Sequence, residues 1–453
     1  MDFLIGQKLI KQKEFGKALK VFQELQKIQT DKRIDFYLGL INFELNYFEK
    51  SIYYYKKYIE NEKNSFPGLL NLAIVMQTIG KFKEAKEIYT KLLNLNNFDV
   101  RPYYGLFNLN SKNLTTNLFE NLNKIKNKKN LNLYEQGIIN FLLSKKEKKN
   151  KKIVNEISFL KKSHESIFNL NYSYNKSSQF YYQKIISKYF DKIKIKNENI
   201  KNISKNKINP IFIIGLPRSG STLVESILTS TKEKISSYGE SHVVNMSLIE
   251  QISSKIFNKN FDEKKFKFEV DLENLTKNIL NRYLDYNHQE KNIEKFLDKS
   301  LENFFNIELI YKIYPNAKFL HTFRRPVDAI ISIYQSMLPD LSWTHSLEDI
   351  LDYVDSYFKV INYYKKKYPN LIMDVNLENF TSDNVNISKN IIKFCNLTWS
   401  NDILNFYERD DLYSKTLSFS QIRSKVTKYE KNKYQEYFYL LNNYKKKFSW
   451  LNY

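Results

Sequence analysis

The chain has 453 residues, a formal net charge of +23, 42% hydrophobic residues and one cysteine. This length exceeds one ordinary domain, and the apolar share can fill more than one core, so we expect two or three domains. Because Cys395 stands alone, an internal disulfide is excluded and nothing in the composition requires an oxidising compartment. The positive charge is spread along the whole chain, which argues against a dedicated nucleic-acid site.

The first residues of the chain enter amphipathic helical spacing directly. They contain no unbroken apolar segment of the kind found in signal peptides. No stretch of the sequence approaches the ~18 consecutive apolar residues of a membrane span. We therefore expect a cytoplasmic protein without a membrane-spanning helix.

The N-terminal part repeats itself, with equivalent phenylalanines 33 and 34 residues apart. In each unit a small residue follows the phenylalanine by three positions, and an aromatic residue follows by seven. The three sets are Phe15, Ala18 and Phe22; Phe48, Ser51 and Tyr55; and Phe82, Ala85 and Tyr89. A small residue lets two helices cross closely, while the aromatic side chain fills the groove beside it. The pattern resembles tetratricopeptide repeats and predicts an α-solenoid over residues 1–110.

Residues 111–205 continue this region less regularly. We expect further helical repeat-like units there, followed by a linker. Repeat arrays of this type bind peptides or protein surfaces in their concave groove. The resemblance therefore implies a protein partner or a protein substrate for the repeats.

A third region, predicted to span residues 206–453, opens with the apolar run 210–215, which is typical of a buried parallel strand. Gly215-Leu-Pro-Arg-Ser-Gly-Ser-Thr222 follows, and an amphipathic helix comes next. A glycine-containing loop between a strand and a helix points backbone N–H groups and the helix dipole at an anion. The lysine of nucleoside-triphosphatase loops is replaced here by Ser221, and the basic residue is Arg218. This disfavours a P-loop kinase or nucleotidase, which stays open as an alternative.

The segment Pro217-Arg-Ser-Gly-Ser-Thr222 resembles the 5′-phosphosulfate loop of sulfotransferases, which use 3′-phosphoadenosine 5′-phosphosulfate. The resemblance extends over about 209–441 and implies a P-loop-type, three-layer α/β domain with a central parallel sheet. Bacterial members of the family also place tetratricopeptide repeats before such a domain, which is related to protein-tyrosine sulfotransferases. The loop residues assigned to the donor by this resemblance are Arg218, Ser219, Gly220, Ser221 and Thr222.

Downstream segments add further donor contacts to this resemblance. Residues 314–332 look like the family's R-x-P-x-D-x-x-x-S segment, so Arg324 and Ser332 are expected to hold the donor's 3′-phosphate. An arginine fork suits a phosphate group. Residues 298–304 are similar to D-K-x-P-x-N-F and place Lys299 at the transferring sulfonate. Ser418 is assigned to a late donor-contacting segment.

Transfer of a sulfonate group requires anion clamps and a base for the acceptor hydroxyl. Glu240 lies in a Gly-Glu segment that related enzymes also carry, and it is predicted to be the base, with Lys299 and Arg218 as the other catalytic residues. Helix capping is the alternative role of Glu240, and His242 is the reserve base. The five histidines are scattered without paired ligands at metal spacing, so no metal is expected.

The sequence therefore predicts a sulfotransferase that acts on a hydroxyl group of a protein tyrosine, a carbohydrate or a small molecule. A scaffold that binds partners through its repeats and has lost catalysis is the alternative from another class. The presence of Arg218, Lys299 and Arg324 disfavours the scaffold.

Overall fold

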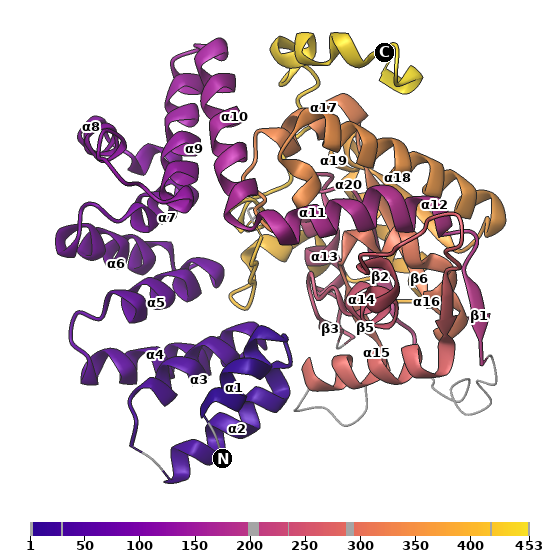
Figure 1. Ribbon diagram of the computed structural model, residues 1–453, viewed down its shortest axis with the longest axis horizontal. Helices are drawn as coiled ribbons and strands as arrows, with labels where there is room; N and C mark the ends of the chain where they lie inside the picture. The colour runs from indigo at the N-terminus through magenta and orange to yellow at the C-terminus, as the bar shows by residue number, and fades with distance from the viewer. Residues whose placement is uncertain are drawn as a thin grey trace. The chain divides into compact units, whose positions relative to one another are not determined.

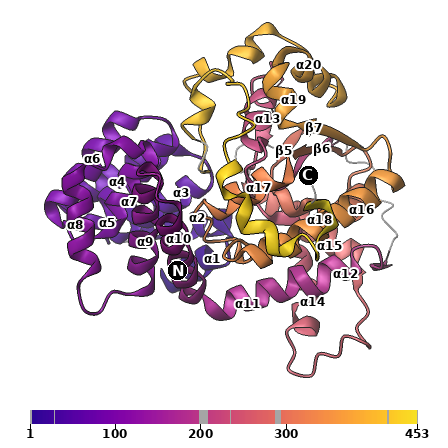
Figure 2. The same cartoon turned by 90° about the horizontal axis from the view of Figure 1, so that it is seen from above.

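The computed structural model describes residues 3–28, 30–197, 208–233, 235–286, 294–416 and 419–451. Its backbone forms two compact units, which are coloured by residue number in Figures 1 and 2. Unit 1 consists of Met1–Ser166, Asn281–Lys291 and Arg409–Ser424. Unit 2 consists of Ile167–Leu280, Asn292–Glu408 and Lys425–Tyr453. The finer domain division drawn from the sequence stays a prediction.

Unit 1 is built mainly of helices joined by short turns, which confirms the predicted helical N-terminal region. Each of the three equivalent phenylalanines opens a helix, and the three small residues that follow them are fully buried. The helices are α1 (Phe3–Lys11), α2 (Phe15–Ile28), α3 (Arg33–Glu44), α4 (Phe48–Asn61), α5 (Phe66–Thr78), α6 (Phe82–Leu95), α7 (Val100–Leu109), η1 (Ser111–Asn113), α8 (Thr116–Lys126), α9 (Leu133–Lys149), α10 (Ile153–Leu170), which continues into unit 2, and η6 (Gln421–Arg423).

Glycines allow the repeated aromatic side chains of unit 1 to lie against neighbouring helices. A Cβ atom on Gly39 would come within 2.8 Å of the Tyr55 ring, and one on Gly105 within 2.3 Å of the Tyr89 ring. Both distances are too short for a side chain, so the close packing depends on the glycines. The assignment to tetratricopeptide repeats in particular stays a prediction.

Unit 2 contains a parallel sheet with the strand order β3-β5-β2-β6-β7. The strands are β2 (Ile211–Gly215), β3 (Ser236–Ser237), β5 (Phe296–Asp298), β6 (Lys318–Phe323) and β7 (Ile372–Asn376). The predicted buried strand is confirmed, because β2 lies at the centre of the sheet and each of its residues is buried. The next strands in the chain, β3 and β5, lie on one side of β2, and β6 and β7 lie on the other. This reversal makes the carboxyl end of β2 a favourable place for a ligand.

The helices of unit 2 lie around this sheet, which occupies its interior in Figures 1 and 2. A separate pair of parallel strands, β1 and β4, is also present. The remaining elements are α11 (Tyr172–Phe180), η2 (Tyr181–Ile186), α12 (Ser187–Tyr189), β1 (Lys194–Lys196), α13 (Ser221–Leu228), α14 (Val243–Ile256), β4 (Glu269–Asp271), α15 (Leu272–Tyr286), η3 (Leu301–Asn306), α16 (Ile307–Ile313), α17 (Pro326–Tyr334), η4 (Ser342–Thr344), α18 (Leu347–Lys367), α19 (Leu377–Ser382), α20 (Asn384–Phe394), η5 (Asn401–Glu408), η7 (Gln435–Tyr444) and η8 (Ser449–Leu451).

Among the helices that the structure describes, none combines the length and the apolar character that crossing a bilayer requires. The single cysteine, Cys395, is buried and carries a free thiol. Burial raises the pKa of this thiol to about 12, so it stays protonated and unreactive at neutral pH. Localisation in the cytoplasm stays a prediction.

Candidate active site

The loop between β2 and α13 has the backbone of an anion-binding turn. Gly215, Arg218 and Gly220 have φ angles of 138°, 65° and 87°, in the region that favours glycine. A Cβ atom on Gly215 would lie 2.2 Å from the carbonyl oxygen of Thr322 on β6, so the close approach of the two strands requires glycine. Gly220 is the N-cap of α13. Loops with left-handed residues before a helix turn their N–H groups toward one point, where an anion is favoured.

Lys299 lies directly after β5 and is only 2% exposed. Its Nζ atom is 2.7 Å from Oε2 of Glu225 and 3.7 Å from Oε1 of Glu240, and it donates to Oγ1 of Thr222 over 3.4 Å. Burial by itself would lower the pKa of Lys299, but the carboxylates of Glu225 and Glu240 raise it above its ordinary value. Lys299 is therefore a buried cation at neutral pH.

Glu225 holds Lys299 on the side of α13, and the sequence analysis did not identify it. Its Oε1 atom accepts a hydrogen bond of 2.6 Å from the hydroxyl of Ser237, while Oε2 pairs with the ammonium group of Lys299. Glu225 follows Thr222 by three positions, a spacing that puts both side chains on one face of a helix. The three-residue spacing could therefore have predicted that Glu225 lies near Thr222 and contacts the same lysine.

Glu240 lies in the turn before α14, and its side chain is 44% exposed. The N-cap of α14 is His242, not Glu240, and the first backbone N–H group of the helix, that of Val243, donates to the hydroxyl of Ser241. The geometry thus gives Glu240 a contact with Lys299 and no capping role. His242 is turned toward a different carboxylate, because its Nδ1 atom lies 2.5 Å from Oε1 of Glu302.

Arg324, which follows β6, and Ser332, on α17, meet at the side chain of Tyr434. The guanidinium carbon of Arg324 lies 5.5 Å from the centre of the Tyr434 ring, and the Tyr434 hydroxyl is hydrogen-bonded to Ser332. Burial alone would raise the pKa of Tyr434, but Arg324, Ser332, Lys433 and Arg218 together lower it below its ordinary value. These four groups around the phenol therefore favour negative charge.

Arg218 belongs to the same cluster. Burial lowers the pKa of Arg218, and the like charge of Arg324 lowers it further. Arg324 is buried and Arg218 is partly buried, and two such cations that repel each other gain stability when an anion binds between them. The Nε atom of Arg324 and the hydroxyl of Ser219 are also buried, and among the described residues neither has a hydrogen-bond partner. Such donors fit an anionic ligand with several oxygens, because a bound anion would satisfy them.

A C-terminal stretch, residues 425–438, contacts this cluster, and we call it the cover segment. The hydroxyl of Tyr429 donates to the carboxylate of Asp328, which is fully buried. Arg325 donates to Oδ1 of Asp328 and to the carbonyl oxygen of Lys431, each over 2.7 Å. Arg325 thus joins α17 to the cover segment.

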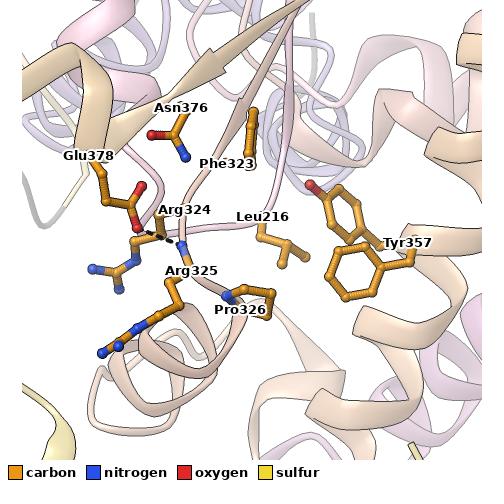
Figure 3. Close-up of a pocket in the computed structure, with 9 residues that line it drawn as sticks. Leu216, Phe323, Arg324, Arg325, Pro326, Tyr357, Asn376 and Glu378 are labelled. Atoms are coloured by element: carbon orange, nitrogen blue, oxygen red, sulfur yellow. Dashed lines mark hydrogen bonds between the residues drawn. The ribbon is translucent and has the colours of Figure 1, made fainter. Parts of the chain in front are cut away.

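A cavity of about 340 Å³ lies beside the arginines (Figure 3). In Figure 3 the guanidinium groups of Arg324 and Arg325 point to the side opposite Tyr357, so the centre of the cavity is mainly apolar. The cavity adjoins the cluster of cations, because Arg324 belongs to the cluster and also lines the cavity. The lining residues are Leu216, Phe323, Arg324, Arg325, Pro326, Tyr357, Phe358, Asn376 and Glu378.

The predicted site residues form two clusters joined by the loop, with one residue outside the described part of the chain. The first cluster is Lys299 with Thr222 and Glu240; the second is Arg324 with Arg218 and Ser332; the loop adds Ser219, Gly220 and Ser221; and Ser418 lies outside the described residues. Within the described ranges, His, Cys, Asp and Glu form no group of at least three that could hold a metal ion.

Residues 210–401 match the model of the sulfotransferase family. The matched segment contains the loop, Glu240, Lys299, Arg324 and Ser332. The match covers less than half of the chain, and this part of the chain is similar to sulfotransferase family domains.

The chain is also similar to a curated relative and to solved structures. An uncharacterized protein of Aquifex aeolicus (strain VF5) is 25% identical over 398 residues, which cover 84% of this chain and 50% of the relative. The chain thus spans about half the length of this curated relative. The sulfotransferase domain of the Synechococcus PCC 7002 olefin synthase is 17% identical, covers 50% of this chain and 88% of its own, and has a TM-score of 0.36. A sulfotransferase from Alicyclobacillus acidocaldarius is 15% identical, with coverages of 52% and 92% and a TM-score of 0.30.

Replacing the carboxylates of Glu225 and Glu240 one at a time should lower the pKa of Lys299 by different amounts. Glu225→Gln should lower this pKa more than Glu240→Gln, because the Glu225 carboxylate is nearer to Nζ, at 2.7 Å against 3.7 Å. Titration of the lysine Nζ signal by NMR measures both shifts. The exposed Glu250→Gln is the matched control and should leave the Lys299 signal unchanged.

The ion pairs of Lys299 with Glu225 and Glu240 make the stability of the fold depend on pH. Since the folded pKa of Lys299 is raised above an unfolded value of about 10.4, their contribution is fully present at neutral pH. It is lost only as the pH rises through the folded pKa. In the NMR titration, a larger change in the pKa of Lys299 for Glu240→Gln than for Glu225→Gln would contradict this geometry.

Proposed function

We propose that the chain is a sulfotransferase that uses 3′-phosphoadenosine 5′-phosphosulfate and carries repeats of the tetratricopeptide type. One observation carries the proposal: Arg218, Arg324 and the buried Lys299 flank one glycine loop at the central strand of a parallel sheet. Buried cations are costly unless they meet negative charge, so this gathering fits a ligand with several anionic groups.

The two clusters fit the two anionic ends of the proposed donor. Arg324 and Ser332 would hold the 3′-phosphate, with Tyr434 against both. Arg218, Thr222 and the loop N–H groups would hold the 5′-phosphosulfate. When bound, the donor supplies a sulfonate group on a phosphate leaving group.

Lys299 and Glu240 fit the chemical roles that the transfer needs. The Lys299 ammonium group, held by Glu225, would offset the negative charge that grows on the departing phosphate oxygen. Glu240 is partly exposed, so an acceptor can reach it from solvent, and its carboxylate would take the proton of the acceptor hydroxyl. No metal is required for either role in this proposal.

The acceptor is proposed to be a hydroxyl compound, whether a protein tyrosine, a carbohydrate or a small molecule. The concave groove of the repeats is the proposed binding place of a protein partner or substrate. A P-loop kinase is the second candidate for the C-terminal domain, and Ser221 in place of the phosphate-binding lysine speaks against it.

The choice of nucleotide tests the proposed function. The protein should bind 3′-phosphoadenosine 5′-phosphate more tightly than ATP and without magnesium, because its cations flank two separate phosphate positions and the lysine for a triphosphate is absent. Calorimetric titration with both nucleotides, with and without magnesium, measures this. Tighter binding of ATP that depends on magnesium would identify a kinase or nucleotidase instead.

Arg324→Ala should weaken binding of 3′-phosphoadenosine 5′-phosphate by roughly 2–3 kcal/mol, since a buried charged hydrogen bond is lost. The loss should nearly vanish with adenosine 5′-phosphate, which lacks the 3′-phosphate. Arg33→Ala is the matched control, because Arg33 is exposed and pairs with Asp31 in unit 1. An equal loss of affinity for both nucleotides would show that Arg324 does not bind the 3′-phosphate.

Glu240→Gln separates catalysis from donor binding. A general base contributes typically ~10²–10⁴-fold to the rate and little to donor affinity. The variant should therefore fold, because Glu225 still pairs with Lys299, keep its nucleotide affinity, and lose at least about a hundredfold in turnover. If turnover stays near that of the wild type, Glu240 is not the base, and His242 becomes the residue to replace.

A further inference from the structure

The three equivalent phenylalanines of the repeats each contact an aromatic ring from the C-terminal half of the chain. These rings belong to the two stretches, 281–291 and 409–424, that are part of unit 1. The phenylalanine face of the repeats is therefore covered by the chain's own residues. The pairs and their ring-centre distances are Phe15 with Tyr286 at 6.5 Å, Phe48 with Tyr413 at 4.8 Å, and Phe82 with Phe419 at 5.8 Å.

Residues 409–416 and 419–424, which we call the tether, also close the ends of two helices. Lys415 Nζ donates over 3.0 Å to the carbonyl oxygen of Glu44, the last residue of α3. Arg423 donates over 3.2 Å to the carbonyl oxygen of Thr78, the last residue of α5. The last carbonyl groups of a helix lack partners within it and carry its negative end, so cations bind them favourably.

Arg423 holds the tether through several hydrogen bonds. Besides Thr78, its guanidinium group donates to the carbonyl oxygens of Leu412 and Phe419, each over 2.5 Å. It lies so close to Gly80 that a Cβ atom there would be 2.1 Å from its Nε atom. The carbonyl contacts, the aromatic contacts and the close fit at Gly80 together form a binding surface for this segment.

We propose that the repeats bind the tether of their own chain and thereby fix the cover segment at the donor site. The cover segment begins at Lys425, the residue after the tether ends, so the peptide backbone alone transmits the restraint. Within unit 2 the cover segment contacts the donor site at two residues. Tyr429 donates to the carboxylate of Asp328, and the ring of Tyr434 lies against Arg324. This role of the repeats rests on the proposed function, because it assigns them an effect on donor affinity.

Arg423→Ala in the full-length protein tests the proposal. Release of the tether should leave the cover segment closed for only part of the time, and the apparent affinity falls in proportion to the closed fraction. If one molecule in ten stays closed, 3′-phosphoadenosine 5′-phosphate binds roughly tenfold more weakly. Amide hydrogen exchange over 425–438 should accelerate as well, although the replaced residue lies outside that segment. This second measurement does not depend on the nucleotide.

The matched control is Lys57→Ala, which removes a cation of the same unit that pairs with Asp35 and not with the tether. It should change neither the affinity nor the exchange over 425–438. Tyr413→Leu is the second variant, used if Arg423→Ala does not fold, and it should act in the same direction.

Normal affinity and normal exchange over 425–438 in a folded Arg423 or Tyr413 variant would overturn the proposal. A wild-type protein that does not bind the nucleotide would instead overturn the proposed function, while the exchange data still decide whether the tether holds the cover segment.

Discussion

The arrangement of the site depends on the burial of one positive charge, the ammonium group of Lys299. Removing an ion from water costs several kcal/mol unless nearby charges and hydrogen bonds offset the loss. Here the offset comes from Thr222 and Glu225 on α13 and from Glu240 before α14. These contacts therefore require the end of β5, the start of α13 and the turn before α14 to be in place together.

The same electrostatic reasoning links the two clusters. Burial lowers the pKa of Arg218, and the repulsion between Arg218 and Arg324 lowers it further. The Lys299 cluster is balanced by carboxylates, whereas the arginine cluster is left with buried donors that have no partner among the described residues. An anionic ligand is therefore favoured most at the arginines. Both arginines lie within the segment 210–401 that matches the sulfotransferase family.

Much of the fold could be predicted because it follows local rules. The repeat spacing marks helix starts at Phe15, Phe48 and Phe82, and the apolar run before Gly215 marks the central strand. The approach of Lys299 to Thr222 was also predictable in outline, because the carboxyl ends of neighbouring parallel strands meet at one edge of a sheet. Tyr434 carries no motif and lies far along the chain from Arg324, so no local pattern could reveal its contact. The tether escaped prediction for the same reason, since contacts between distant segments leave no period in the sequence.

Transfer of radioactive sulfur from labelled 3′-phosphoadenosine 5′-phosphosulfate is the most direct measurement of the central claim. Wild-type protein, incubated with this donor and a host lysate, is expected to move the label onto hydroxyl-bearing products that fractionation can separate. The double variant Lys299→Met with Glu225→Gln removes both charges of the closest ion pair, so it should fold and bind the nucleotide yet transfer almost no label. Label transfer by the double variant at the wild-type rate, or no transfer by the wild type, would contradict the claim.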